Sequence, residues 1–199
     1  MVNQFREGAS QSGHEFGAPF DRRESPVSFT GEATADSLLA WLKDAHAMEK
    51  QAETMLSAMA DRIDSYPEVR AMLQEHLQET RSQAEQLESC IVRLGGDTST
   101  VKDLMGKFMA SAQGMSGMFV SDEIVKGYMA SYTFEHMEIM AYRVLIAAAE
   151  LLDDAETAAV CKRILAQEER MAARLAEFAP TLTQQFLMRS ETPGLDAKH

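Results

Sequence analysis

The chain has 199 residues, 45% of them hydrophobic and 25% charged, a composition typical of one globular domain with a sizeable core. Nineteen Lys and Arg stand against 31 Asp and Glu, and the formal net charge of −12 argues against a nucleic-acid-binding protein. No apolar run approaches the ~18 residues of a membrane span, and the N-terminal sequence lacks the apolar core of a secretory signal. Cys90 and Cys161 have no metal-finger spacing, so reduced, buried thiols in a cytoplasmic protein are expected.

Three segments are distinguished by their composition. Residues 1–34 are rich in Gly, Ser and charged side chains without a hydrophobic period, which predicts a flexible or surface-wrapping N-terminal arm. Residues 35–180 carry the periodicity of long helices and are predicted to form one bundle. Residues 181–199, punctuated by Pro193-Gly194, are predicted to be a C-terminal tail.

The first two helices are separated by Tyr66-Pro67. Apolar residues at three- and four-residue steps predict a helix from about Asp36 to Ser65. A second helix is predicted from about Pro67 to Leu94, because proline is favoured in a first helical turn. Gly95-Gly96 ends it, since glycine readily adopts the left-handed conformation found after a helix.

The third and fourth helices show the same period. Ser121 or Asp122 caps a helix that is predicted to reach about Leu152. Asp153-Asp154 is predicted to form a turn or cap, and the fourth helix runs from about Ala155 to Ala179. Pro180 is expected to end this last helix, because proline removes a backbone donor and clashes with the preceding turn.

The lengths of the connections predict the topology. Short links join the first helix to the second and the third to the fourth, so each pair should be antiparallel. About 25 residues, 97–121, connect the two pairs, with a short helix predicted at Val101–Met109. A connection of this length can cross a whole bundle. The predicted fold class is therefore all-α, a ferritin-like antiparallel four-helix bundle with a long crossover between helices two and three.

Polar residues interrupt the apolar stripe of every predicted helix near its middle. They are Glu49 on the first helix, His76 and Glu79 on the second, Glu135 and Glu138 on the third, and Glu168 on the fourth. A buried ionised carboxylate costs several kcal/mol unless it is paired or coordinated, and several together repel one another. Lys and Arg are scarce on these stripes, so a multivalent cation is the simplest source of neutralising charge.

Carboxylates with an occasional histidine suit iron or manganese, and two metals about 3.5–4 Å apart can share bridging carboxylates. The sequence thus predicts a di-metal centre. Glu49 and Glu168 are the predicted terminal ligands, Glu79 and Glu138 the bridging candidates, and Glu135 and His76 the auxiliary ligands.

Each of these residues also has a structural interpretation. A glutamate at the edge of a stripe commonly pairs with Lys or Arg, and a single buried histidine is commonly hydrogen-bonded in the core. His46 and His136 lie off the inner stripes and are expected at the surface or behind the ligands. Tyr128 and Tyr142 are expected to be buried, with their hydroxyls hydrogen-bonded.

Three motifs in order resemble the YciF/YciE-like ferritin-like family. The first helix carries M-E-K-Q at Met48–Gln51, and the second carries H-x-x-E-T-x-x-Q at His76–Gln83. The third carries E-H-x-E-I-x-x-Y at Glu135–Tyr142, and Glu168 is the best counterpart of the family's glutamate on the fourth. The resemblance covers about residues 37–179. It implies a ferritin-like bundle, usually dimeric, in bacterial cytoplasm, associated with stress responses and holding a rubrerythrin-like or di-metal centre.

The chain departs from the ferritin pattern at two positions. Ser82 follows Glu79 by three residues and Met171 follows Glu168 by three, so the Glu-x-x-His pair of ferritins is absent. Ala172 also stands where relatives tend to carry an acid. The site could therefore hold one metal, two or none.

Two functions follow from these observations. The first is a stress-related, metal-binding protein with an iron or manganese centre, which acts in oxidase- or peroxidase-like chemistry or in metal handling. The alternative is a non-enzymatic interaction or scaffold protein on a degenerate ferritin-like fold, with its inner carboxylates matched by Arg, Tyr or water. A homodimer is predicted in either case, and Phe108 and Phe119 are candidates for its contact.

Overall fold

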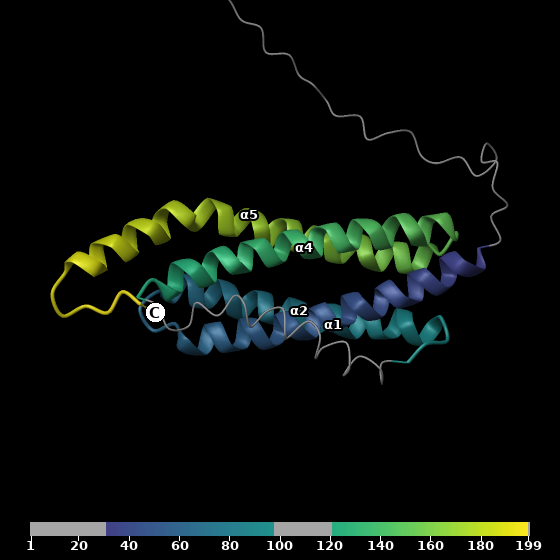
Figure 1. Cartoon of the computed structure of the whole chain (residues 1–199), viewed down its shortest axis with the longest axis horizontal. Coiled ribbons are helices and arrows are strands. Elements are labelled where there is room, and N and C mark those ends of the chain that lie inside the picture. Colours follow the sequence, from purple (N-terminus) through teal and green to yellow (C-terminus); the bar gives the residue numbers. More distant parts are fainter. Residues whose placement is uncertain (1–30, 98–120, 199) are drawn as a thin grey trace, which may run out of the picture. The chain divides into compact units, whose positions relative to one another are not determined.

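The computed structural model describes residues 31–97 and 121–198, and over these ranges it forms four helices and no strand (Figure 1). The helices are α1 (Glu32–Arg62), α2 (Pro67–Arg93), α4 (Glu123–Leu151) and α5 (Ala155–Glu191). The predicted arm up to residue 30 and the predicted crossover, with its short helix at Val101–Met109, lie outside the described residues.

The helices pack as two antiparallel pairs, α1 with α2 and α4 with α5 (Figure 1). Arg62 at the end of α1 bonds Glu123 at the start of α4 (2.6 Å), so these two helices are also antiparallel. Arg93 at the end of α2 bonds Asp154 at the start of α5 (2.6 Å) in the same way. The predicted all-α, ferritin-like four-helix bundle is confirmed.

Local chemistry explains where the helices begin and end. Pro67 lies in the first turn of α2, where its missing N–H removes no helical hydrogen bond. Gly95, just beyond the end of α2, has a φ of 79°, a conformation that glycine adopts without strain. The Asp154 carboxylate accepts a hydrogen bond from the Thr157 N–H (3.2 Å) and caps α5. These three features follow the sequence prediction.

The core between the helices is built of leucines and other large apolar side chains from all four. Leu42, Leu73, Leu145 and Leu175 are essentially inaccessible to solvent. The hydroxyl of Tyr128 donates to the Leu175 carbonyl (2.7 Å), as expected for a buried tyrosine. None of the described helices carries a stretch apolar enough, over sufficient length, to cross a bilayer.

The prediction that Pro180 ends the last helix is wrong, because α5 continues through it to Glu191. A proline inside a helix costs about 3 kcal/mol, and the C-terminal part of α5 bends (Figure 1). Packing beyond the proline offsets this cost: Leu182 is buried in the core, and Arg189 donates to the hydroxyl of Ser65 (2.7 Å). Tertiary contacts therefore outweigh the local preference of proline.

The extended end of α5 can be tested by truncating its buried leucine. Leu182 is 2% exposed, whereas Leu187, one turn further along, is 55% exposed. We expect Leu182→Ala to lower the free energy of unfolding by about 2–5 kcal/mol and Leu187→Ala to change it by less than about 1 kcal/mol. Urea denaturation measures both, and equal effects would contradict the packed extension.

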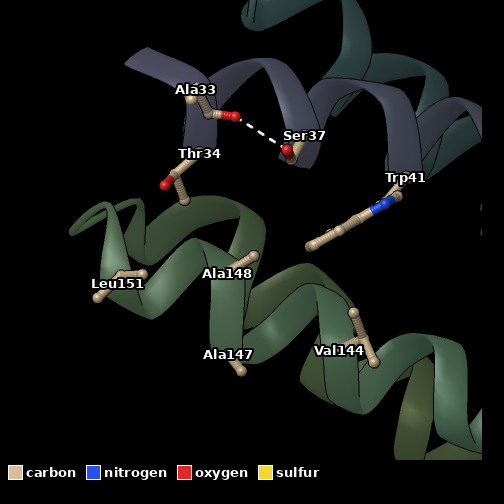
Figure 2. A pocket seen from close by; sticks show the side chains of 8 residues that line it. All are labelled: Ala33, Thr34, Ser37, Trp41, Val144, Ala147, Ala148 and Leu151. Carbon is tan, nitrogen blue, oxygen red and sulfur yellow. Dashed lines mark hydrogen bonds between the residues drawn. The ribbon is translucent and has the colours of Figure 1, made fainter. Parts of the chain in front are cut away.

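A groove of about 520 Å³ lies between the start of α1 and the end of α4. The Trp41 ring extends from α1 toward α4, over Val144 and Ala148 (Figure 2). None of the six predicted metal ligands lines this groove. It is thus a feature of the surface, separate from the polar interior described next.

Candidate metal centre

All four helices contribute acidic or histidine side chains to the interior at mid-length. Glu49 comes from α1, His76 from α2, Glu135 and Glu138 from α4, and Glu168 from α5, and each is at most 2% exposed. Each stands on the apolar face that its helix packs inward, because helical residues three or four apart share one face. The structure therefore buries five of the six residues predicted from the sequence.

Four of these residues form one compact group: His76, Glu135, Glu138 and Glu168. One potential ligand atom from each lies within 4.8 Å of the other three. Nε2 of His76 is 3.2 Å from Oε2 of Glu135 and 3.4 Å from Oε2 of Glu168. One nitrogen and three carboxylates from three helices thus converge on one point.

Glu49 is fully buried on α1 but is not one of this group of four. The Tyr142 hydroxyl, on α4, donates to its Oε1. Its Oε2 has no hydrogen-bond partner among the described residues. The Glu49 charge also raises the pKa of Glu138, so the two carboxyls interact electrostatically inside the bundle.

Glu79 differs from the other predicted ligands, because its side chain is 22% exposed. Its Oε1 accepts a hydrogen bond from Arg170 on α5, and its Oε2 lies 3.3 Å from Nδ1 of His76. The structure does not bring Glu79 into the group of four. It lies at the rim of the site, behind His76.

Burial strongly disfavours charge on the inner carboxyls. It raises the pKa of Glu49 to about 8, against the opposing hydrogen bond from Tyr142. Burial, and then the Glu49 charge, raise the pKa values of Glu138 and Glu168 well above the ordinary range. Without a cation, burial and mutual repulsion therefore favour the protonated form of these carboxyls.

The pKa of His76 is shifted in the opposite sense to that of a simple buried histidine. Burial lowers it, but the hydrogen bond and charge of Glu135, followed by those of Glu79, outweigh burial and raise it. The acidic neighbours of His76 thus favour its protonated form in the metal-free protein.

The donors present fit a multivalent cation. Glu49 Oε2 and Glu138 Oε1 are buried without a hydrogen-bond partner among the described residues. In this part of the chain, no Lys or Arg lies within ion-pairing distance of Glu135, Glu138 or Glu168. An unpaired buried carboxylate oxygen costs free energy that a bound cation would recover. Carboxylate oxygens with one imidazole nitrogen are ligands typical of iron and manganese.

Gln83 is a site residue to which sequence reasoning gave no role. It is fully buried on α2, and its amide donates to Oε1 of Glu168 and, at 3.2 Å, to Gln167. The sequence feature that could have identified Gln83 is its position on the inner stripe of the second helix, two turns after His76. A buried amide on such a stripe indicates a polar partner opposite it.

The two remaining histidines have different surroundings. His46 is buried rather than at the surface, the first of its two predicted positions; burial lowers its pKa, against the nearby charge of Glu88. His136 is exposed, as predicted, and packs edge-on against the Tyr132 ring with centroids 4.5 Å apart. Neither belongs to the group of four.

The fold, with carboxylates and a histidine gathered in its interior, defines a ferritin-like four-helix bundle protein. Residues 33–188 match the family described as a domain of unknown function, DUF892, and the chain belongs to this family. The predicted resemblance to YciF-like proteins is confirmed.

Three solved structures are similar to this chain. A protein from Xanthomonas campestris is similar over 80% of this chain and 99% of its own, with 38% identity and a TM-score of 0.69. Bacterioferritin of Desulfovibrio desulfuricans, described with a diiron site, is 20% identical (79% and 86% covered; TM-score 0.63). The E. coli stress protein YciF is 22% identical (74% and 95% covered; TM-score 0.60). The last two likenesses concern the fold alone.

Proposed function

We propose that this chain is a metal-binding protein that holds iron or manganese in a carboxylate centre inside its bundle. The observation that carries the proposal is the convergence of His76, Glu135, Glu138 and Glu168 within 4.8 Å in a buried place. The bacterioferritin of Desulfovibrio desulfuricans, whose fold this chain shares, has a diiron site. The proposed centre holds two metals, with Glu49 of α1 as a further ligand.

The chain's own residues would prepare this centre in three ways. Tyr142 fixes one oxygen of Glu49, and Gln83 fixes one oxygen of Glu168. The second oxygen of Glu49 has no hydrogen-bond partner among the described residues, and the second oxygen of Glu168 faces Nε2 of His76. The group is buried in the core of the bundle, and charge interactions are stronger in such low-dielectric surroundings than in water. Cation binding would release the protons of Glu49, Glu138 and Glu168, so affinity should rise with pH.

A bound iron or manganese pair supplies electron transfer to oxygen or peroxide, and we propose such oxidase- or peroxidase-like chemistry, or metal handling, as the activity. We propose a role in stress and a cytoplasmic location. The fold shared with a protein described as an E. coli stress protein supports the first, and two free buried cysteines agree with the second.

The second candidate, a scaffold without metal, is supported by a different set of contacts. Tyr142 and Gln83 each satisfy one oxygen of a buried glutamate, and Arg170 pairs with Glu79. With the inner carboxyls protonated, the bundle could also be stable without a cation. The two candidates therefore differ in whether metal binds, not in fold.

Metal analysis of the purified full chain tests the proposal. We expect protein expressed in iron- or manganese-supplemented medium to contain one to two equivalents of metal. The double variant Glu135→Ala plus Glu168→Ala should contain almost none, because two of the converging ligands are lost. A wild-type content far below one per chain, equal to that of the double variant, would favour the scaffold.

The homodimer stays a prediction. Its candidate contact residues, Phe108 and Phe119, lie outside the described residues. On α4, however, Met129, Met140 and Val144 are exposed large apolar side chains, which supports a contact with a second copy. The molar mass in solution, twice 22.1 kDa for a dimer, checks it.

A further inference from the structure

The two ring nitrogens of His76 face different partners. Nε2 points toward the three carboxylates of the group, 3.2 Å from Glu135 and 3.4 Å from Glu168. Nδ1 points away from it, 3.3 Å from Oε2 of Glu79. A histidine can give only one lone pair to a metal inside this group, from Nε2, and this requires the remaining ring proton to be on Nδ1.

Glu79 is placed to hold that proton. One of its oxygens faces Nδ1 of His76, and the other is occupied by the Arg170 guanidinium. An arginine bond to one oxygen fixes the orientation of a carboxylate, and a carboxylate oriented in this way is a good acceptor for an imidazole N–H. With both oxygens engaged outside the group, Glu79 has none directed at the point where the other carboxylates meet.

We propose that Glu79 is a positioning residue rather than a metal ligand, and that the chain Arg170–Glu79–His76 presents Nε2 of His76 to the metal. The inference rests on the proposed function, because it assigns a role in a metal centre. It replaces the bridging role that the sequence predicted for Glu79. Carboxylates behind metal-ligating histidines fix the tautomer and raise the basicity of the ligand.

The same helix offers a matched control. Glu75 lies one turn before Glu79 and pairs with Arg174 of α5 at 2.9 Å, so both glutamates bond an arginine of the same partner helix. Glu75 is 60% exposed and is not a contact of His76. Substitutions at Glu75 therefore remove a similar ion pair without touching the histidine.

Zinc is a suitable probe because it is diamagnetic and binds imidazole and carboxylate. We expect Glu79→Ala to weaken zinc binding 10- to 100-fold in competition with a chelating dye, with unchanged stoichiometry. Glu79→Gln should recover part of this loss, because its amide oxygen still accepts the Nδ1 proton, whereas its NH2 cannot accept from Arg170. Glu75→Ala and Glu75→Gln should each change the affinity less than threefold.

Nitrogen-15 NMR of the zinc-loaded protein gives a second readout that a general loss of packing would not produce. We expect the wild-type His76 to show a protonated Nδ1 and a metal-bound Nε2. Glu79→Ala should weaken or abolish this signature, while Glu79→Gln and both Glu75 variants should keep it.

Three outcomes would overturn the inference. Equal zinc affinity in Glu79→Ala and Glu75→Ala would show that Glu79 positions nothing. Loss of bound zinc in both Glu79→Ala and Glu79→Gln would identify Glu79 as a ligand. A wild-type protein that binds no zinc, iron or manganese would refute the proposed function and this role together, whereas the first two outcomes leave the proposed function intact.

Discussion

Metal-free protein is expected to lose stability steadily as the pH rises from 5 to 8. Glu49 has a pKa of about 8 in the folded chain and an ordinary value near 4.5 when unfolded. Between these values the unfolded chain releases this proton and the folded chain keeps it, so rising pH favours unfolding. The stabilising effect of the proton is complete below the unfolded pKa and is lost by about pH 8.

The expected size of this effect is large because several groups act in the same direction. Each carboxyl that stays protonated only in the folded state contributes roughly 1.4 kcal/mol per pH unit. Because the pKa values of Glu138 and Glu168 are also raised, they add to the loss of stability with rising pH. The raised pKa of His76 acts in the same direction. Urea denaturation at pH 5, 6, 7 and 8 measures the slope.

Glu49→Gln is the variant that isolates one carboxyl. The amide oxygen can still accept the Tyr142 hydrogen bond, but it does not titrate, so the pH slope should become shallower. Glu85→Gln, at an exposed position of α2, should leave the slope unchanged. Stability of the metal-free wild type that is flat or rising over this window would contradict the protonated interior.

Bound metal should remove this pH dependence. Protons and the cation compete for the same carboxylates. As the pH rises, fewer protons compete, so metal binding adds more to the free energy of unfolding. The difference in Tm between metal-loaded and metal-free protein is therefore expected to be larger at pH 8 than at pH 5. This comparison also separates the two candidate functions, because a scaffold gains nothing from metal at either pH.

Much of the fold was readable from hydrophobic spacing and from a few residues with strong local preferences. Apolar steps of three and four residues located all four helices, and Pro67 and Gly95 marked ends that the structure confirms. Pro180 was misleading, because a sequence window contains no information about the core contact that Leu182 makes beyond it. Tertiary packing is not local, and this is why it overrode the proline.

The burial of the candidate site was also predictable, but the contacts of each member were not. Helical periodicity indicates which side of a helix a residue faces, and that was enough for Glu49, His76, Glu138 and Glu168. It does not indicate how far a residue at the edge of the stripe turns toward a neighbouring helix. Glu79 stands at such an edge, and an arginine from α5, Arg170, holds it at the rim.

Replacing Glu138 by glutamine is expected to abolish metal binding and, at the same time, to stabilise the metal-free protein. Glu138 stands among Glu49, Glu168 and Glu135, whose charges raise its pKa after burial itself. Loss of a converging ligand should weaken metal affinity at least ~100-fold. In the metal-free protein, the Glu138 carboxyl must either be buried as a charge or take up a proton on folding. The neutral amide of the variant does neither, and its N–H can donate to a neighbouring carboxylate.

The stabilisation should be about 1–3 kcal/mol at pH 8, or several degrees in Tm for a chain of this size, and should shrink toward pH 5. Glu150→Gln serves as the control on the same helix, because its exposed pair with Lys162 is worth less than about 1 kcal/mol. Calorimetry of the metal-free proteins and metal titration of each measure the two effects.

The two measurements fail independently, and each failure has its own meaning. Unchanged metal affinity in Glu138→Gln would remove Glu138 from the ligand set. A less stable metal-free variant at pH 8 would mean that the folded chain already satisfies the Glu138 carboxylate, as the scaffold alternative requires. A buried carboxylate that destabilises the metal-free protein is expected only where a bound ligand stabilises the protein in turn. Lost metal affinity together with higher metal-free stability would therefore identify the interior as a metal site.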